Sequence, residues 1–145
     1  MPGWIQQGYE EYHKRLPAEY KPQLHEVAPV VRNKSTKVAK AKQEEATRIQ
    51  RVLPEQAHVV CLDEHGAAWD TVKLSQQLHD WSQNIRQLAL VIGGADGFDE
   101  GFLRRADERW SLSPLTLPHG LVRVMVMEQL YRAWSLLNGH PYHRA

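Results

Sequence analysis

Cysteine is almost absent from this 145-residue sequence, which contains only Cys61. A single cysteine excludes an internal disulfide framework and is typical of proteins in a reducing cytoplasm. No apolar run approaches the roughly 20 residues of a membrane-spanning helix, and residues 1–4 lack the basic and apolar segments of a secretory signal. At this length, these absences predict a cytoplasmic protein with no membrane partner and a single domain over residues 1–145.

Net charge is small as well, at +1, but its distribution is uneven. Residues 32–51 contain only two acidic side chains, Glu44 and Glu45, and seven basic ones: Arg32, Lys34, Lys37, Lys40, Lys42, Arg48 and Arg51. Clustered cations attract phosphate backbones because binding releases condensed counterions. The segment is therefore either a nucleic-acid contact or a solvated helix face.

Helix and strand patterns alternate along the chain. The spacing of apolar residues and the helix-ending signals predict helices over 2–14, 35–52, 99–109 and 120–138. A further helix is predicted to be capped by Asp70 or Thr71 and to carry the apolar residues from Val72 to Ile85. Apolar and β-branched runs predict buried strands over 57–62 and 87–92, an alternating strand over 23–30 and an extended segment over 110–117. Because parallel strands need crossover helices, this order predicts an α/β fold with a mostly parallel sheet and flanking helices.

The stretch LALVIGGADGF, residues 88–98, passes from a buried strand to glycine in one step. In open α/β sheets, ligands bind beyond the carboxyl ends of the strands, and glycines there leave the backbone accessible to a ligand. The G-G-x-x-G spacing lacks the dinucleotide-binding fingerprint, and no P-loop lysine accompanies it. Taken alone, the loop is explained equally well as a ligand contact or as a tight turn.

The C-terminal residues 110–145, WSLSPLTLPHGLVRVMVMEQLYRAWSLLNGHPYHRA, form a more specific pattern. Together with LVIGGADGF and VVCLDEHGAAWDT earlier in the chain, they resemble the SPOUT-superfamily methyltransferases that modify N3 of a pseudouridine in bacterial 23S ribosomal RNA. The resemblance covers essentially the whole chain. It implies an α/β fold with a C-terminal trefoil knot, S-adenosyl-L-methionine as methyl donor, a homodimer, and assembled ribosomes as substrate.

The same resemblance assigns a set of residues to the donor site: Leu62, Gly93, Gly94, Leu112, Ser113, Pro114, Leu115, Thr116 and Leu117. The two glycines would give the donor access to the backbone, Leu62 would line the same cleft, and residues 112–117 would wrap the adenine. From the residues alone, SLSPLTL is better explained as an edge strand interrupted by proline.

One departure from the family pattern concerns the N-terminus. Family members usually begin with a further apolar strand, whereas this chain starts at the Met of MPGWIQQGYEEY. The first strand of the sheet is therefore expected to be missing, through a late start site or a truncation. That loss leaves a second function class open: a catalytically silent RNA- or ribosome-binding module that retains the fold.

The predicted helix 120–138 is apolar on nearly every side in its first half. A helix of this kind must be buried on two sides. A second subunit is one way to cover it, and twofold pairing is the commonest form of such an interface; burial within its own fold is the other. With the family resemblance, we expect a homodimer through helix 120–138.

The tail GHPYHRA concentrates side chains that can exchange protons or contact a substrate: His140, Tyr142, His143 and Arg144. Methylation of an imide nitrogen requires removal of its proton, which a histidine can accept near neutral pH, while arginine can bind phosphate or developing negative charge. The four are therefore candidate catalytic residues, and a disordered polar tail is the alternative. His140 and His143 have the H-x-x-H spacing of a metal pair, but no carboxylate cluster accompanies them, so no metal is expected.

Overall fold

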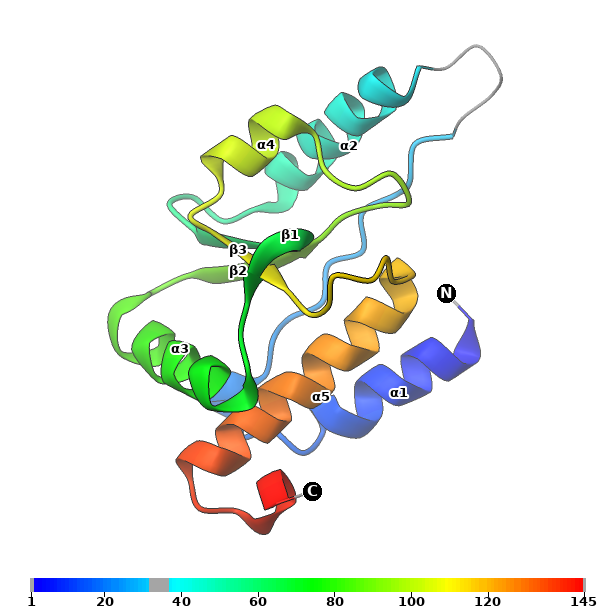
Figure 1. The fold of residues 1–145 in the computed structure, drawn as a ribbon. Helices are drawn as coiled ribbons and strands as arrows, with labels where there is room; N and C mark the ends of the chain where they lie inside the picture. The colour runs from blue at the N-terminus through cyan, green and yellow to red at the C-terminus, as the bar shows by residue number, and fades with distance from the viewer. Residues whose placement is uncertain (1, 32–36, 145) are drawn as a thin grey trace. The chain divides into compact units, whose positions relative to one another are not determined.

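The computed structural model describes residues 2–31 and 37–144 (Figure 1). The described residues form two compact units. Unit 1 draws on the ranges 1–23, 68–85 and 115–145, and unit 2 on 24–67 and 86–114. The single domain over residues 1–145 stays a prediction.

Unit 2 is built on a three-stranded sheet in the order β2-β1-β3. Its strands are β1 (His58–Ala68), β2 (Leu88–Ile92) and β3 (Glu108–Ser111). The central strand, β1, pairs with β2 in parallel, with Leu62 opposite Ile92. Apolar β-branched residues favour strands that are covered on both faces, and the buried residues of β1 are Val60, Cys61 and Leu62.

Strand β3 lies on the other side of β1 and runs in the same direction. Near its start, the backbone N–H of Asp107 donates to the carbonyl of Val59 at 2.9 Å. At its end, the hydroxyl of Ser111 lies 3.0 Å from the carbonyl of Glu64, further along β1. The predicted α/β fold with a parallel sheet and flanking helices is confirmed.

The helices of unit 2 are α2 (Val38–Val52) and α4 (Glu100–Arg105). They pack on a buried cluster made by Cys61, Val91, Phe98 and Phe102, against which Ala46 and Ile49 of α2 also lie. The carboxylate of Asp99 accepts the backbone N–H of Phe102 at 3.1 Å and so caps the start of α4. In this way α2 and the segment 98–102 cover the buried face of the strands that carry Cys61 and Val91.

Two predicted boundaries and one predicted strand differ clearly from the structure. Strand β1 continues to Ala68, well beyond the predicted 57–62, and α4 ends at Arg105 instead of 109 because β3 begins at Glu108. The strand predicted over 23–30 is wrong, since these residues form no helix or strand. The Arg48 guanidinium donates to the backbone carbonyls of Ala28 and Pro29 at 2.9 and 3.1 Å. A side chain of α2 thus makes the hydrogen bonds that a neighbouring strand would make to these carbonyls in a sheet.

Unit 1 consists of helices packed around α5. Its elements are α1 (Gly3–His13), η1 (Ala18–Tyr20), α3 (Thr71–Asn84), α5 (His119–Leu137) and η2 (Pro141–Arg144). Helices α1 and α3 both contact α5, and η2 follows it (Figure 1). Gly8 permits the close approach of α1, because a Cβ there would lie 3.1 Å from a methyl group of Val124.

The sequence signals for the helices of unit 1 are confirmed. The Asp70 carboxylate accepts the backbone N–H of Lys73 at 2.8 Å and caps α3, whose inner side chains Leu74, Leu78 and Trp81 are buried. Among the described residues, no helix is long and apolar enough to cross a membrane. The C-terminal trefoil knot stays a prediction.

Candidate functional site

Several of the predicted donor-site residues lie in the strands of unit 2 or directly after them. Leu62 is buried and pairs with Ile92, so Gly93 directly follows the paired end of β2. On the other side of β1, Leu112 follows the last residue of β3. Ligands of α/β proteins bind at the carboxyl edge of a sheet, and Gly93 and Leu112 follow the ends of β2 and β3 there. Leu62 lies within β1, at its last residue paired with β2.

The glycine loop itself is a tight turn. The backbone N–H of Gly97 donates to the carbonyl of Gly94 at 3.0 Å, and Gly97 has a positive φ of 82° that favours glycine. A Cβ on Gly93 would lie 3.2 Å from the ring of Phe98, and one on Gly94 would lie 2.7 Å from a carboxylate oxygen of Glu45. Each glycine thus has a close neighbour within the chain, and its contact with a donor stays a prediction.

The segment 112–117 divides between the two units after Pro114. Leu112 and Ser113 are half-buried in unit 2, and the hydroxyl of Ser111 lies 2.9 Å from the carbonyl of Ser113, which bends the chain away from β3. In unit 1, Leu115 is 69% exposed, Thr116 is exposed and Leu117 is half-buried. That all nine predicted residues line one cleft stays a prediction.

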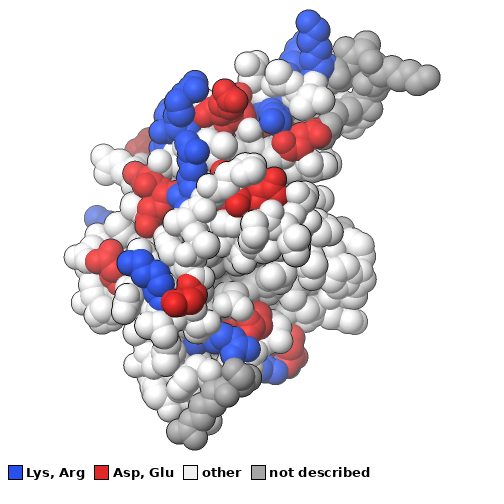
Figure 2. All heavy atoms as spheres, in the orientation of Figure 1, with Lys and Arg blue, Asp and Glu red and all other residues white. Residues whose placement is uncertain are grey.

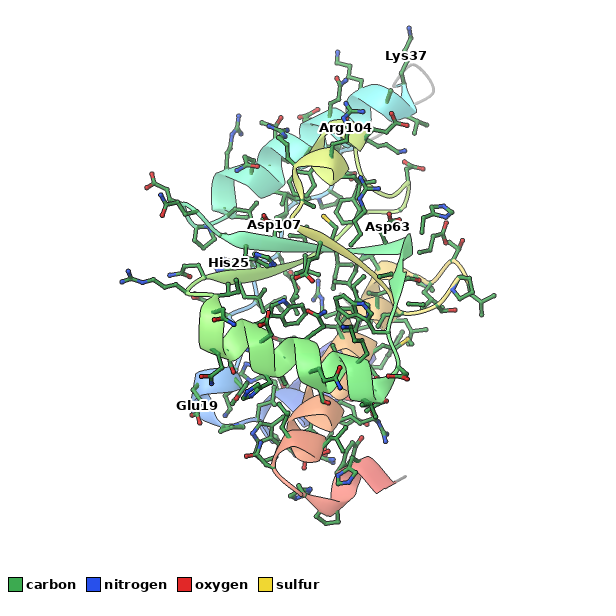
Figure 3. The ribbon with its side chains drawn as sticks, turned by 60° about the vertical axis from the view of Figure 1, so that its left-hand side comes forward. Glu19, His25, Lys37, Asp63, Arg104 and Asp107 are labelled. Carbon is green, nitrogen blue, oxygen red and sulfur yellow. The ribbon has the colours of Figure 1, made fainter. Side chains whose placement is uncertain are left out.

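Unit 2 also contains a charged cleft of about 450 Å³. Its charged and ionisable lining comes from α2, β1, the glycine loop, α4 and β3: Lys42, Asp63, Glu64, His65, Asp96, Glu100, Arg104 and Arg109. Figure 3 labels two of these residues, Asp63 on β1 and Arg104 on α4. The cleft adjoins the glycine loop, because Gly97 and Phe98 line both it and the small hollow under Gly93 and Gly94.

Sequence reasoning missed this cleft. Within the part of the chain that the structure describes, Lys42, Arg104 and Arg109 make no ion pair with a carboxylate. All three line the cleft, so their positive charges are not neutralised by direct contact there. A cleft with unpaired cations and nearby carboxylates suits a ligand that carries both signs of charge. The sequence signal was the charged run Asp63-Glu64-His65 directly after the buried strand residues.

The basic segment 32–51 falls partly outside the described residues, which exclude Arg32 and Lys34. From Val38 onward it forms α2, with Lys37 at its N-cap. On the face shown in Figure 2, Lys and Arg atoms lie among Asp and Glu atoms instead of forming one continuous basic patch. The segment's role in RNA binding stays a prediction.

In unit 1, the described residues of the predicted catalytic tail form η2, which packs beside α5. The Tyr142 hydroxyl donates to Glu128 at 3.3 Å, and its ring centroid lies 4.6 Å from that of Tyr131. Glu128 also accepts hydrogen bonds from Arg132 at 2.8 Å, whose guanidinium carbon lies 4.9 Å from the Tyr142 ring centroid. Tyr142 is thus held by an ion pair on α5, and the described part of the tail is not a disordered segment.

Burial, a hydrogen bond with Tyr12 and the negative charge of Glu128 raise the pKa of Tyr142 to about 12. The hydrogen bond to Glu128 also raises the pKa of Arg132. At neutral pH, Tyr142 is therefore a neutral phenol that can donate a hydrogen bond but cannot serve as a proton acceptor.

The two histidines of the tail differ in their surroundings. His140 accepts the backbone N–H of Tyr142 through Nδ1 at 3.2 Å, and the backbone N–H of His140 donates to the carbonyl of Ser135 at 2.8 Å, so His140 fixes the turn after α5. In contrast, Nδ1 of His143 is buried and has no hydrogen-bond partner among the described residues. The side chain of Arg144 lies outside those residues. Within the described ranges, no group of three or more His, Cys, Asp or Glu side chains is placed to hold a metal ion.

Comparison with known proteins adds a second line of evidence. Residues 1–143 match the family described as "Predicted SPOUT methyltransferase". The Ribosomal RNA large subunit methyltransferase H of Hydrogenovibrio crunogenus is 51% identical over 144 residues, which are 99% of this chain and 92% of that protein. The proteins of the same name from Burkholderia thailandensis and Hahella chejuensis are 50% and 49% identical, over 100% and 99% of this chain and 93% and 92% of their own lengths.

Proposed function

The chain belongs to the SPOUT methyltransferase family, and from that premise we propose that it methylates N3 of a pseudouridine in the 23S rRNA of the large ribosomal subunit. The observation that carries the proposal is the similarity, over nearly the full chain, to relatives named as large-subunit ribosomal RNA methyltransferases. The choice of N3 of pseudouridine, and of the assembled ribosome as substrate, comes from the motif resemblance. Because ribosomes are the proposed substrate, the proposed location is the cytoplasm.

The proposed methyl donor is S-adenosylmethionine, and the residues of unit 2 fit it. The donor has an uncharged adenosine part and a methionine part with a carboxylate, an ammonium group and a sulfonium. Leu62, Gly93, Gly94, Leu112 and Ser113 would offer apolar and backbone surface for the adenosine side, and a contact of residues 114–117 with the donor rests on the motif resemblance alone. The neighbouring cleft of about 450 Å³ has the size of small-molecule sites, roughly 300–1,000 Å³, and both signs of charge.

Within the cleft, charge decides the orientation of the methionine part. Lys42 and Arg104 would bind its carboxylate, and Asp63 and Glu100 its ammonium group. When bound, the donor supplies an electrophilic methyl group. The chain's own contribution is to hold both ends of the donor, which fixes the methyl group relative to the base and removes much of the entropic barrier.

The tail would handle the proton of the imide nitrogen. His143 is the proposed proton acceptor, because its buried Nδ1 has no other described partner and a histidine can accept a proton near neutral pH. Tyr142, a neutral phenol fixed through Glu128 and Arg132, would hydrogen-bond to the base. His140 supports the turn that places both, and Arg144 is proposed to contact the RNA phosphate.

A homodimer through α5 is part of the proposal. Helix α5 packs against α1 and α3 within its own unit, which covers Val126, Met127 and Leu130. Its first half nevertheless retains half-buried apolar side chains, including Leu121 and Met125. Twofold pairing would cover these residues.

Calorimetry with two nucleosides tests the donor site. The first is S-adenosylmethionine and the second is 5′-methylthioadenosine, which lacks the amino-acid end. Arg104→Gln should weaken binding of S-adenosylmethionine about tenfold, the size of a lost charge-assisted hydrogen bond, and leave binding of 5′-methylthioadenosine unchanged. Arg105→Gln is the matched control, because Arg105 bonds the carbonyl of Gly101 and does not line the cleft. If Arg104→Gln weakened binding of both nucleosides equally, the methionine end of the donor would not bind in this cleft.

The reaction itself is tested on ribosomes from cells that lack the protein. Large subunits from such cells are incubated with the purified protein and S-adenosylmethionine carrying a labelled methyl group, and the modified base is mapped by mass spectrometry. We expect one methyl group on N3 of one pseudouridine in 23S rRNA. Binding of the donor without any methyl transfer would support the silent ribosome-binding module instead.

A further inference from the structure

Arg15, two residues beyond the end of α1, contacts three aromatic rings that come from three separate elements. Its guanidinium carbon lies 5.2 Å from the ring centroid of Tyr12 on α1, 5.6 Å from that of Tyr131 on α5 and 5.9 Å from that of Tyr142 in η2. A guanidinium within about 6 Å of a ring centroid is attracted to the π-system of the ring. One side chain near the start of the sequence therefore connects α1, α5 and the C-terminal tail.

A second guanidinium, that of Arg132 on α5, contacts the ring of Tyr142. Arg132 lies 4.9 Å from the ring centroid of Tyr142, and its bonds to Glu128 keep it there. Glu128 and Arg132 are both largely buried, with 17% and 20% of their side chains exposed. Arg132 and Glu128 therefore hold the Tyr142 ring from α5, and Arg15 contacts the same ring from the other end of the sequence.

Arg15 is itself anchored. Its guanidinium bonds the Glu11 carboxylate at 2.5 Å, one helical turn earlier, and that hydrogen bond raises the pKa of Arg15. The side chain is a cation at neutral pH, as arginine is in proteins generally. This cation is anchored to Glu11 of α1 and extends over the tyrosines.

We propose that Arg15 is a positioning residue, which holds the Tyr142 ring and with it the tail 140–144 in the arrangement that methyl transfer requires. This role rests on the proposed function, in which the tail meets the reacting base. Arg15 does not touch the base. It acts through Tyr142, and indirectly through the adjoining residue His143.

The simpler explanation is that Arg15 only forms a surface ion pair with Glu11. Lys14 separates the two explanations, because it pairs with the same carboxylate at 2.8 Å and makes no ring contact. Lys14→Gln removes an ion pair of Glu11 and leaves the rings untouched. Arg15→Gln removes an ion pair of Glu11 and all three ring contacts, and Arg15→Lys keeps the charge but loses the planar group.

Chymotrypsin digestion measures how readily the tail leaves its packed position, independently of methyl transfer. It cleaves after Tyr142 only when this side chain leaves its packing and enters the protease, and release of the peptide 143–145 is followed by mass spectrometry. Loss of the ring contacts should accelerate the release about five- to tenfold in Arg15→Gln, less in Arg15→Lys and not at all in Lys14→Gln. Circular dichroism melting confirms that each variant is folded.

Steady-state kinetics on ribosomes then tests the role in the reaction. Arg15→Gln should lower kcat, leave the calorimetric Kd for S-adenosylmethionine unchanged, and be partly rescued by Arg15→Lys. The proposal is overturned by unchanged release of the peptide, by equal acceleration in Lys14→Gln, or by faster release with an unchanged kcat. If the wild-type protein transfers no methyl group at all, the proposed function fails, and with it the role in catalysis, while the proteolysis still reports whether Arg15 holds the tail.

Discussion

Replacing Gly94 with alanine separates the stability of the fold from binding of the donor. The new Cβ would lie 2.7 Å from a carboxylate oxygen of Glu45, the far end of a flexible and half-buried side chain that can move aside. Gly94 does not have a positive φ, so alanine can adopt its backbone conformation. Removing glycine also lowers the entropy of the unfolded chain, which stabilises by about 0.4–1 kcal/mol. We therefore expect the free energy of unfolding to change by less than about 1 kcal/mol.

Donor affinity should respond very differently. If the donor lies against the backbone of Gly94, a Cβ there prevents the close approach, and the expected loss is tenfold or more in Kd, equivalent to about 1.4 kcal/mol. Gly93→Ala is the contrasting variant, because its Cβ would lie 3.2 Å from the ring of Phe98, which is 8% exposed and packed in the core. Overpacking of this kind costs about 1–3 kcal/mol of stability.

Urea denaturation and calorimetry with S-adenosylmethionine measure the two quantities on the same samples. Glu45→Ala completes the set, since it removes the carboxylate that Gly94→Ala would displace. Wild-type affinity in Gly94→Ala would refute the proposal that the donor contacts this glycine. A loss of affinity in Glu45→Ala equal to that in Gly94→Ala would show that the effect comes from the displaced carboxylate and not from the donor.

Three further expectations concern RNA, the tail and the dimer. Lys37→Gln with Lys40→Gln should weaken ribosome binding and reduce its log–log salt slope by about 0.7–0.9 for each lost phosphate contact; an unchanged slope would make this face of α2 a solvated surface. Because the pKa of Tyr142 is raised to about 12, its phenol stays protonated as the pH rises, so Tyr142→Phe should lower kcat without altering the shape of its pH profile below about pH 10. A new inflection or a lost limb in that range would contradict this assignment. Met125→Glu should yield monomers in light scattering, because an unpaired charge in an interface costs several kcal/mol. Met127→Glu should instead unfold the protein, because Met127 is only 2% exposed. A Met125→Glu variant that is still a dimer would show that α5 does not form the interface.

The elements that the sequence predicts well are those with two agreeing local signals. Helix α3 has both a capping Asp70 and a regular apolar face, and β2 has a continuous apolar run that ends in glycine. The wrong strand over 23–30 had alternation alone. Alternation describes a side-chain pattern, but a strand also needs a partner for its backbone groups, and Arg48 takes up the carbonyls of Ala28 and Pro29 instead.

The candidate site shows the same limit for a different reason. Leu62 and Gly93 could be predicted from the sequence because Leu62 is the last residue of one apolar run and Gly93 directly follows another. The charged cleft was not, since its lining comes from five separate segments that only the parallel register and the packing of α2 and α4 bring together. No local pattern relates Lys42 to Arg104.

Adjacent residues can differ just as much as distant ones. Lys14 and Arg15 are neighbouring cations near the end of one helix, and both pair with Glu11. Their sequence context predicts the same surface role for both. Only the path of α5 and η2 decides that Arg15 extends over Tyr131 and Tyr142 while Lys14 remains 67% exposed. A contact between the start and the end of the chain is set by tertiary packing, so the role of Arg15 follows from the fold and not from the sequence around it.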